Sequence, residues 1–426
     1  MRIGFFTDNY LPSRDGIAIS VETFRAELEK MGHEVYIIAP SPSLRYKEES
    51  DKIIRFPAFK GLFYEDYLTS LFLPPVAMKR IDELNLDIVH YHTLGQVGFL
   101  GAYYAMKRKL PLISTYHTDY YEYVKHYKKT LPGVIALSLI APTITGGGLS
   151  DYRSALLNIK PEKSIDDWNQ KIVEKGVTTL NNACDLVIAP SEKIRKQLNG
   201  WNTSCPIEVI PTGVDEIPAS KNQIEKWREK LKLDKDTKLI AFVGRLGTEK
   251  NLSLLVKSFE IIRERLPGTK LLVIGGSGSQ TEDAEGNKQN DVDNFKKQEG
   301  IIFTGYVAHN ELGALYRLST VFAFPSLTDT QGLVINEAAL SGLPIVMIDK
   351  DITLVVKNGI NGFISKNNHI DMADKLLQIL ESEDLIKRMG EQSKLIAKQY
   401  SEKNQAKIVL RIYEKLKEKY DHRIVL

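Results

Sequence analysis

Short apolar runs alternate with amphipathic segments along the first half of the chain. Residues 2–7 form an apolar run, apolar positions then recur at helical spacing from Ser20 to Gly32, and residues 35–39 form the next run. Further strand-like runs occupy residues 88–92, 111–117 and 185–191. This succession of strand, helix and strand predicts a parallel sheet covered by helices on both faces.

The same pattern restarts after residues 207–218, a segment with Pro and Gly that we interpret as a linker. Residues 221–232 predict a charged helix, and strand-like runs follow at 239–246, 271–276, 301–305, 321–326 and 344–349. The second half therefore predicts another doubly wound α/β domain. From about Ser401 an apolar stripe predicts a terminal helix whose packing partner the pattern leaves open.

Composition narrows the class of protein. A chain of 426 residues, 43% hydrophobic and 26% charged, is ordinary for a globular protein of two or three domains. A net charge of +3 excludes a strongly basic surface, so we expect no nucleic-acid partner. Two cysteines support no disulfide framework. An early acid at Asp8 and the lack of a long apolar run lead us to expect a cytoplasmic protein without a signal peptide or spanning helix.

Two segments of the second half carry residues suited to a diphosphate and a sugar. VGRLGTEKN places Arg245 and Lys250 after a strand and before a helix. SLTDTQGLVINEAALSGLPIV places Asp329 after a strand and Glu337 on a helix that opens at Gly332. The helix start suits phosphate, and the carboxylates suit sugar or ribose hydroxyls. Surface charge and an incidental acidic pair are the alternatives.

The first half offers weaker candidates. His117 ends a strand, where sites collect in such sheets, although a lone histidine is also often structural. Asp15-Gly16 precedes a helix and fits either an anion-binding helix start or a plain turn. His90 and His92 share one face of a strand but have no third ligand nearby in sequence, so we expect no metal site there.

Three further segments are less specific. The acids of Asp349-x-Asp351 follow a strand but are common in turns, so they too predict no metal site. The polar stretch 279–299 is interpreted as a solvated loop or frayed helix, with a lid as the alternative. The uncharged run 131–149 is interrupted by Pro and Gly and does not predict a spanning helix.

Basic and aromatic residues concentrate in the first half and are typical of an anionic membrane interface. Residues 59–78 add large apolar side chains beside them. A solvated face or core packing is the alternative. The membrane or acceptor candidates are Lys107, Arg108, Lys109, Tyr120, Tyr121, Lys125, Lys128 and Lys129.

In this order the motifs resemble those of retaining GT-B glycosyltransferases of the large nucleotide-sugar-dependent family, and within it bacterial diacylglycerol α-glucosyltransferases. The likeness rests on FFTDNYLPSRDGIAIS, TYHTDYYEYVKHY, VIPTGVD, VGRLGTEKN and SLTDTQGLVINEAALSGLPIV, which together span nearly the whole chain. The last resembles the family's E-x7-E signature with Asp329 in place of its first Glu. The Asp329 side chain is one methylene shorter than Glu, so we expect it to reach less far and to change which sugar is preferred.

The resemblance implies two Rossmann-like, doubly wound domains that face a central cleft. The acceptor-side domain would comprise residues 1–212 together with a C-terminal helix, 405–426, that crosses back to it. Residues 213–404 would form the donor-binding domain.

By motif position, Arg245 and Lys250 would hold the donor diphosphate, Asp329 the sugar hydroxyls and Glu337 the ribose. Backbone N–H groups at Gly332, Leu333 and Val334 would bind phosphate. In the first domain Gly16 would leave room for the donor, and His117 would lie beside the reacting sugar. Together with His117, the groups that act on the reacting centre would be Arg245, Lys250 and Asp329. The family needs no divalent metal, and we expect no cofactor.

The activity implied is that of a hexosyltransferase that moves glucose from UDP-glucose, with retention, to a hydroxyl of a lipid such as diacylglycerol. Such an enzyme would lie on the inner face of the cell membrane as a peripheral protein. One alternative keeps the chemistry but uses a soluble sugar, a glycan-lipid or a protein glycan as acceptor. Another is a non-catalytic nucleotide-sugar-binding partner. A dehydrogenase is disfavoured because no GxGxxG follows the first strand.

Overall fold

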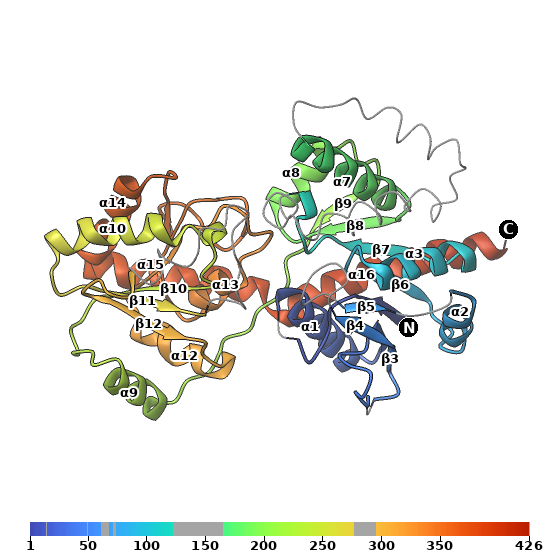
Figure 1. The fold of residues 1–426 in the computed structure, drawn as a ribbon, viewed down its shortest axis with the longest axis horizontal. Coiled ribbons are helices and arrows are strands. Elements are labelled where there is room, and N and C mark those ends of the chain that lie inside the picture. Colours follow the sequence, from blue (N-terminus) through green and yellow to red (C-terminus); the bar gives the residue numbers. More distant parts are fainter. Residues whose placement is uncertain are drawn as a thin grey trace. The chain divides into compact units, whose positions relative to one another are not determined.

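The computed structural model describes residues 1–13, 15–48, 50–60, 68–70, 74–121, 165–276 and 295–425. The chain forms two compact units (Figure 1). Unit 1 comprises Met1–Gly213 with Glu402–Leu426, and unit 2 comprises Val214–Ser401.

Unit 1 is built on a seven-stranded parallel sheet in the order β3-β2-β1-β6-β7-β8-β9, beside a separate antiparallel pair β4-β5. Its strands are β1 (Arg2–Phe6), β2 (Glu34–Pro40), β3 (Ile53–Phe56), β4 (Ala58–Lys60), β5 (Leu68–Ser70), β6 (Ile88–Tyr91), β7 (Leu112–Thr115), β8 (Leu186–Ala189) and β9 (Ile207–Val209). Its described helices are α1 (Gly16–Lys30), α2 (Pro74–Asp82), α3 (Gln96–Arg108), α7 (Ile165–Asn182), α8 (Glu192–Gly200) and α16 (Glu402–Val425).

The linker interpretation of residues 207–218 is wrong at its first residues. Ile207–Val209 form β9, which pairs in parallel with β8 at the edge of the sheet. A three-residue edge strand buries too little of its length to leave an apolar run in the sequence. The following Pro and Gly, which suggested a linker, belong to the extended segment beyond it.

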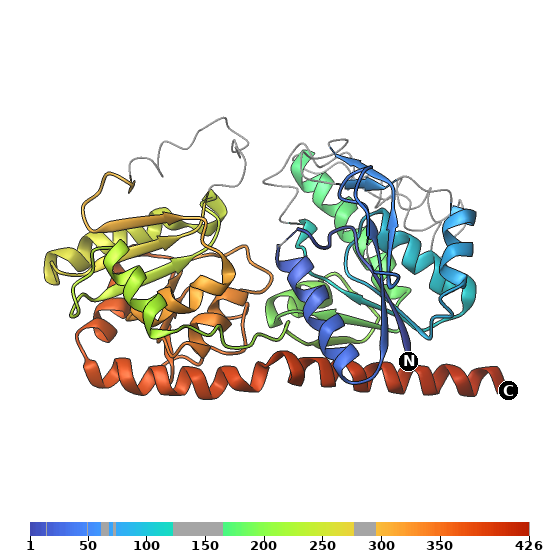
Figure 2. The same ribbon diagram turned by 90° about the horizontal axis from the view of Figure 1, so that it is seen from below.

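Helix α16 packs on unit 1, as the family resemblance implied. Ala406, Val409 and Tyr413 are almost fully buried. They join one hydrophobic cluster with side chains of β1, such as Phe5, and of α1, such as Phe24. Figure 2 shows α16 running alongside α1, against which it packs. The apolar stripe predicted from sequence is therefore the face that α16 buries against unit 1.

Unit 2 is built on a six-stranded parallel sheet in the order β12-β11-β10-β13-β14-β15. Its strands are β10 (Leu239–Val243), β11 (Lys270–Ile274), β12 (Ile301–Gly305), β13 (Val321–Phe324), β14 (Ile345–Met347) and β15 (Gly362–Ile364). Its described helices are α9 (Lys221–Lys230), η2 (Thr248–Lys250), α10 (Leu252–Arg265), α12 (His309–Leu318), α13 (Leu333–Leu340), α14 (His369–Leu380), α15 (Glu383–Ala397) and η3 (Lys398–Tyr400).

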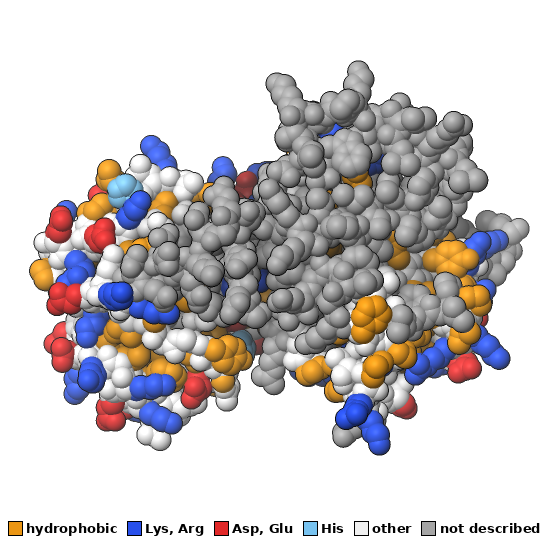
Figure 3. Space-filling model, viewed as in Figure 1, with side chains coloured by type: hydrophobic (Ala, Val, Ile, Leu, Met, Phe, Trp, Pro, Cys, Tyr) orange, Lys and Arg blue, Asp and Glu red, His pale blue; other side chains and the backbone are white. Residues whose placement is uncertain are grey.

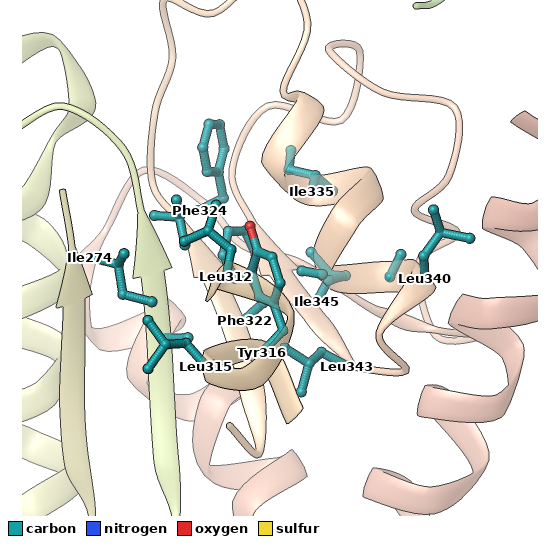
Figure 4. Close-up of a cluster of buried hydrophobic side chains, with 14 of the residues drawn as sticks. Ile274, Leu312, Leu315, Tyr316, Phe322, Phe324, Ile335, Leu340, Leu343 and Ile345 are labelled. Atoms are coloured by element: carbon teal, nitrogen blue, oxygen red, sulfur yellow. The ribbon is translucent and has the colours of Figure 1, made fainter. Parts of the chain in front are cut away.

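Helices cover both faces of this sheet, so the predicted doubly wound fold is confirmed. On one face, Leu312, Leu315 and Tyr316 of α12 pack with Phe322 of β13 and Ile335 of α13 (Figure 4). On the other face, side chains of α10 and α14 form a second cluster with strand residues that point the opposite way. Because both faces are covered, the central strands β10, β13 and β14 are apolar throughout, as their sequences indicated.

Each sheet has one place where the strand order reverses. In unit 1 it lies between β1 and β6, and in unit 2 between β10 and β13. The helices that follow these neighbouring strands go to opposite faces, and the loops at their carboxyl ends leave space for a ligand. Most of the residues singled out from sequence follow these strands or their neighbours.

Candidate active site

The loop after β10 in unit 2 carries the motif with Arg245 and Lys250. A Cβ atom at Gly275, after β11, would lie 1.9 Å from the carbonyl oxygen of Gly244. Gly275 also has a φ of +136°, which side chains rarely allow, so glycine is required there. The ends of β10 and β11 therefore approach closely, and this fixes where the loop begins.

The two motifs of unit 2 come together at the switch point. The hydroxyls of Ser326 and Thr328, after β13, donate to the carbonyl oxygen of Glu249 over 3.4 and 3.3 Å. Nζ of Lys250 lies 2.5 Å from Oδ1 of Asp329. The Lys250 and Asp329 side chains are only 12% and 17% exposed, so the pair is largely shielded from water. The Asp329 carboxylate fixes the position of the Lys250 ammonium group at the end of the sheet.

Arg245 differs from Lys250 in its exposure. Its side chain is 64% exposed, and its guanidinium lies 3.9 Å from a carboxylate oxygen of Glu249. An exposed pair at this distance contributes little to stability. Arg245 therefore marks the rim of the site, while Lys250 lies within it.

Helix α13 begins beside this charge pair. Its N-cap is Gly332, and no side chain in the described part of the chain caps it. The first backbone N–H groups of a helix lack partners within the helix and carry a partial positive charge. The N–H groups of Leu333 and Val334 thus form a partly positive helix start where the sequence predicted one, and phosphate binding there stays a prediction.

Glu337, one turn into α13, is held by two side chains of α12. The hydroxyl of Tyr316 donates to Oε2 over 2.8 Å, and Nε2 of His309 lies 3.1 Å from Oε1. Tyr316 is fully buried, and Figure 4 shows its hydroxyl pointing away from Leu343 toward the α13 side of the cluster. Burial raises the pKa of Tyr316 well above its usual value, so its hydroxyl stays a donor. His309 is 56% exposed and reaches Glu337 from the surface.

The sequence analysis did not single out His309 or Tyr316. They lie seven residues apart and therefore on one face of α12. That spacing was visible in the sequence. Their common partner was not, because it depends on how α12 packs against α13.

The histidines of unit 1 form a stacked column at the ends of β6 and β7. The His90 and His92 rings have centroids 4.1 Å apart, and those of His92 and His117 are 5.4 Å apart. Nδ1 of His92 lies 3.1 Å from Nε2 of His117. His90 uses both ring nitrogens, since Nδ1 lies 2.6 Å from the Tyr413 hydroxyl and Nε2 2.7 Å from that of Thr115.

Burial keeps these imidazoles uncharged. It lowers the pKa of His117 to about 4, although the nearby Asp15 carboxylate acts in the opposite direction. Burial lowers the pKa values of His90 and His92 well below their usual value as well. His117 is therefore a neutral hydrogen-bonding group at neutral pH.

The start of α1 is a capped turn. The Asp15 carboxylate accepts hydrogen bonds from the N–H groups of Ile17 and Ala18 over 2.9 and 3.0 Å. The plain-turn interpretation thus describes this helix start, because its own side chain occupies the donors that an anion would need. A Cβ at Gly16 would meet no atom of the described residues within 4 Å. Packing within unit 1 therefore does not require glycine there, and a role in making room for the donor stays a prediction.

The membrane candidates divide into two groups. Lys107, Arg108 and Lys109 are exposed at the end of α3, where Arg108 makes a two-pronged ion pair with Asp82 of α2. Tyr120 and Tyr121 are partly buried instead. The Tyr120 hydroxyl accepts from the Leu94 N–H over 3.2 Å, and the Tyr121 ring lies 5.4 Å from that of Trp201.

The core interpretation therefore fits these two tyrosines better than a surface belt does. Lys125, Lys128 and Lys129 lie outside the described residues, as do the run 131–149 and most of the polar stretch 279–299.

The remaining sequence candidates have local partners. The Asp349 carboxylate accepts from the Asp351 N–H over 3.1 Å, which closes a turn. Across the described ranges, no three His, Cys, Asp or Glu side chains are grouped as metal ligands. No helix in those ranges is both long and apolar enough to cross a membrane.

Two doubly wound parallel α/β units in one chain are the architecture of the GT-B fold. Residues 14–216 match the model described as Glycosyltransferase Family 4, and residues 223–396 match the model described as Glycosyl transferases group 1. The chain belongs to this family of glycosyltransferases, as the sequence motifs indicated.

Among curated relatives, the chain is 28% identical to the alpha-monoglucosyldiacylglycerol synthase of Acholeplasma laidlawii over all of this chain and 99% of that protein. It is 29% identical to the synthase of the same name from Streptococcus pneumoniae, over 81% of this chain and 70% of that protein. Among solved structures, it resembles Anabaena HepE in complex with UDP-glucose, with a TM-score of 0.66 and 15% identity over 97% of this chain and all of that chain. The last comparison supports the fold.

Proposed function

We propose that this glycosyltransferase moves glucose from UDP-glucose, with retention, to a hydroxyl of diacylglycerol or a related lipid. The observation that carries the proposal is the shielded Lys250–Asp329 pair beside the uncapped start of α13. It combines a cation and helix N–H groups for a diphosphate with a carboxylate for sugar hydroxyls. The full-length likeness to monoglucosyldiacylglycerol synthases supports the choice of sugar and acceptor.

When the donor binds, its diphosphate replaces Asp329 as the main ion-pair partner of Lys250. Lys250 then contacts the phosphate oxygens. The N–H groups of Leu333 and Val334 donate to the same diphosphate, and Arg245 contacts it from the rim of the site. Asp329, partly released from Lys250, accepts hydrogen bonds from the sugar hydroxyls. Glu337, held by Tyr316 on one oxygen, offers its other oxygen to the ribose in place of His309.

The chemical step exchanges one bond at the anomeric carbon for another on the same face. The bond from that carbon to the diphosphate oxygen breaks, a bond to the acceptor oxygen forms, and the acceptor proton passes to the departing phosphate. Lys250 and the helix start stabilise the charge that grows on the diphosphate. Because these groups supply the positive charge, we propose that turnover needs no divalent metal.

The lipid acceptor requires contact with a membrane surface. On the face drawn in Figure 3, Lys and Arg side chains gather over the part of unit 1 that carries α2, with hydrophobic side chains beside them. Lys79 and Arg80 of α2, together with Lys107 and Lys109, are exposed there, and Val76 is 66% exposed. This combination suits an anionic bilayer, and we propose that the protein is peripheral on the cytosolic face.

The test is turnover of UDP-glucose on anionic vesicles with and without diacylglycerol, with the product identified by mass spectrometry. The proposal predicts a hexosyl-diacylglycerol that forms only with the lipid and persists in EDTA. UDP release without a glycolipid would instead point to a soluble sugar or a glycan acceptor. Absence of any turnover with several sugar nucleotides would favour a non-catalytic binding protein.

A further inference from the structure

His92 contacts the proposed sugar-binding histidine directly, although the sequence pattern gave it no role. Its Nδ1 lies 3.1 Å from Nε2 of His117, and its side chain is 1% exposed. The ring is held in place by His90 stacked on one side and by the edge contact with Phe5, whose centroid is 4.7 Å away. Its orientation is thus fixed by packing.

One hydrogen atom lies between Nδ1 of His92 and Nε2 of His117, and it can be bonded to either of these two nitrogens. If this hydrogen were bonded to Nε2 of His117, Nδ1 of His92 would accept it. The ring proton of His92 would then be on Nε2 of His92. That atom is buried and has no hydrogen-bond partner among the described residues. A buried N–H without an acceptor costs more free energy than a ring lone pair without a donor. The surroundings therefore favour the hydrogen on Nδ1 of His92.

We propose that His92 is a positioning residue that donates from Nδ1 to Nε2 of His117 and thereby fixes the His117 proton on Nδ1. Both rings are neutral, since burial lowers both pKa values, so each carries one proton. This fixes which ring nitrogen of His117 donates and which accepts. His117 presents an N–H group to its surroundings, and its one lone pair is engaged by His92.

This inference rests on the proposed role of His117 beside the sugar and gives that role a direction. His117 donates a hydrogen bond to a sugar oxygen and does not accept the proton of the acceptor hydroxyl. That proton therefore goes to the departing phosphate, as the proposed step requires. A change in the protonated nitrogen would turn the donor into an acceptor and misalign it with the sugar.

The direct test is nuclear magnetic resonance of the full chain with 15N-labelled histidine, because the 15N shift separates a protonated ring nitrogen from a bare one. The His117 signals are assigned by their loss in His117→Gln. We expect Nδ1 protonated and Nε2 bare in the wild-type protein. A proton on Nε2 of His117 would overturn the inference, whether or not the enzyme transfers glucose to a lipid.

Variants separate positioning from packing. His92→Phe keeps a flat ring but removes the donor, so we expect the 15N signal of the bare His117 Nε2 to move downfield, toward a nitrogen without a hydrogen bond, and kcat to fall about tenfold, with the UDP Kd unchanged. His92→Asn places an amide N–H near the position of Nδ1 and should recover part of the loss. Tyr413→Phe, the matched control, removes a hydrogen bond of His90 in the same column and should leave the His117 proton on Nδ1.

An unchanged 15N signal of the His117 Nε2 in His92→Phe would contradict the inference. If that variant fails to fold, the wild-type spectrum alone decides.

Discussion

The two units place different kinds of groups at the carboxyl ends of their parallel strands. In unit 2, the ends of β10 and β13 carry a shielded ion pair, Lys250–Asp329. In unit 1, the ends of β6 and β7 carry neutral imidazoles whose pKa values burial lowers. The same fold therefore brings side chains together at the strand ends in both units, but the identity of those side chains determines which ligand each unit can bind. Charge suits a diphosphate, and neutral hydrogen-bonding groups suit a sugar.

The largest effect should follow loss of the charge in unit 2. Lys250→Ala removes the cation proposed to stabilise the departing diphosphate, so we expect turnover of UDP-glucose to fall by a factor of about 10²–10³. Lys257→Ala, which removes an exposed lysine of α10, is the matched control and should retain wild-type turnover. Equal rates for the Lys250 variant and its control would rule out the proposed donor site.

The next effect concerns the membrane-facing residues of unit 1. Each lysine near an anionic bilayer contributes about 1 kcal/mol, so Lys107→Ala with Lys109→Ala should weaken binding to phosphatidylserine vesicles roughly thirtyfold. Both side chains are exposed, and neither belongs to the proposed catalytic groups. Flotation with vesicles measures the affinity, and Lys226→Ala with Lys257→Ala in unit 2 is the control. A loss that is the same on neutral vesicles would contradict an electrostatic contact.

A smaller effect is expected at the buried hydroxyl that holds Glu337. Tyr316→Phe keeps the ring in its cluster but removes the 2.8 Å hydrogen bond. We expect UDP affinity to fall about fivefold to tenfold. The preference for UDP over its 2′,3′-dideoxy analogue should shrink as well, because Glu337 is proposed to bind the ribose. Calorimetry with both nucleotides measures it, and an unchanged preference would show that Tyr316 serves packing alone.

The broadest effect is on stability in acid. His90, His92 and His117 have folded-state pKa values below the usual 6.5, so the unfolded chain binds protons first as pH falls. Their contribution is complete above pH 6.5 and is lost progressively as the pH falls below that value, by up to about 1.4 kcal/mol per histidine and pH unit. Asp8 acts oppositely, since burial raises its pKa.

Hydrogen exchange at pH 7 and pH 5, corrected for intrinsic rates, measures this effect peptide by peptide. Protection should fall in the β6 and β7 peptides of unit 1 more than in the β10 and β13 peptides of unit 2. An equal change in both units would argue against a role for the buried histidines.

Sequence patterns predicted most of this architecture but little of its side-chain geometry. The apolar runs located the central strands because parallel strands are buried on both faces and leave continuous apolar segments. The edge strand β9 was missed because it is short and lies beside Pro and Gly. The motifs located Lys250, Asp329 and His117 at strand ends, but not their partners. The contacts of Tyr316 with Glu337 and of His92 with His117 join different elements, so only packing reveals them.

The division of labour between the units is the central claim, and UDP titration of two variants tests it most directly. The account predicts that Lys250→Ala loses UDP affinity by at least tenfold, while His117→Ala binds UDP like the wild-type protein and yet transfers glucose poorly. UDP contains the diphosphate and the ribose but not the glucose that is transferred, so we expect it to contact only the groups of unit 2. Equal losses of UDP affinity in the two variants would contradict it.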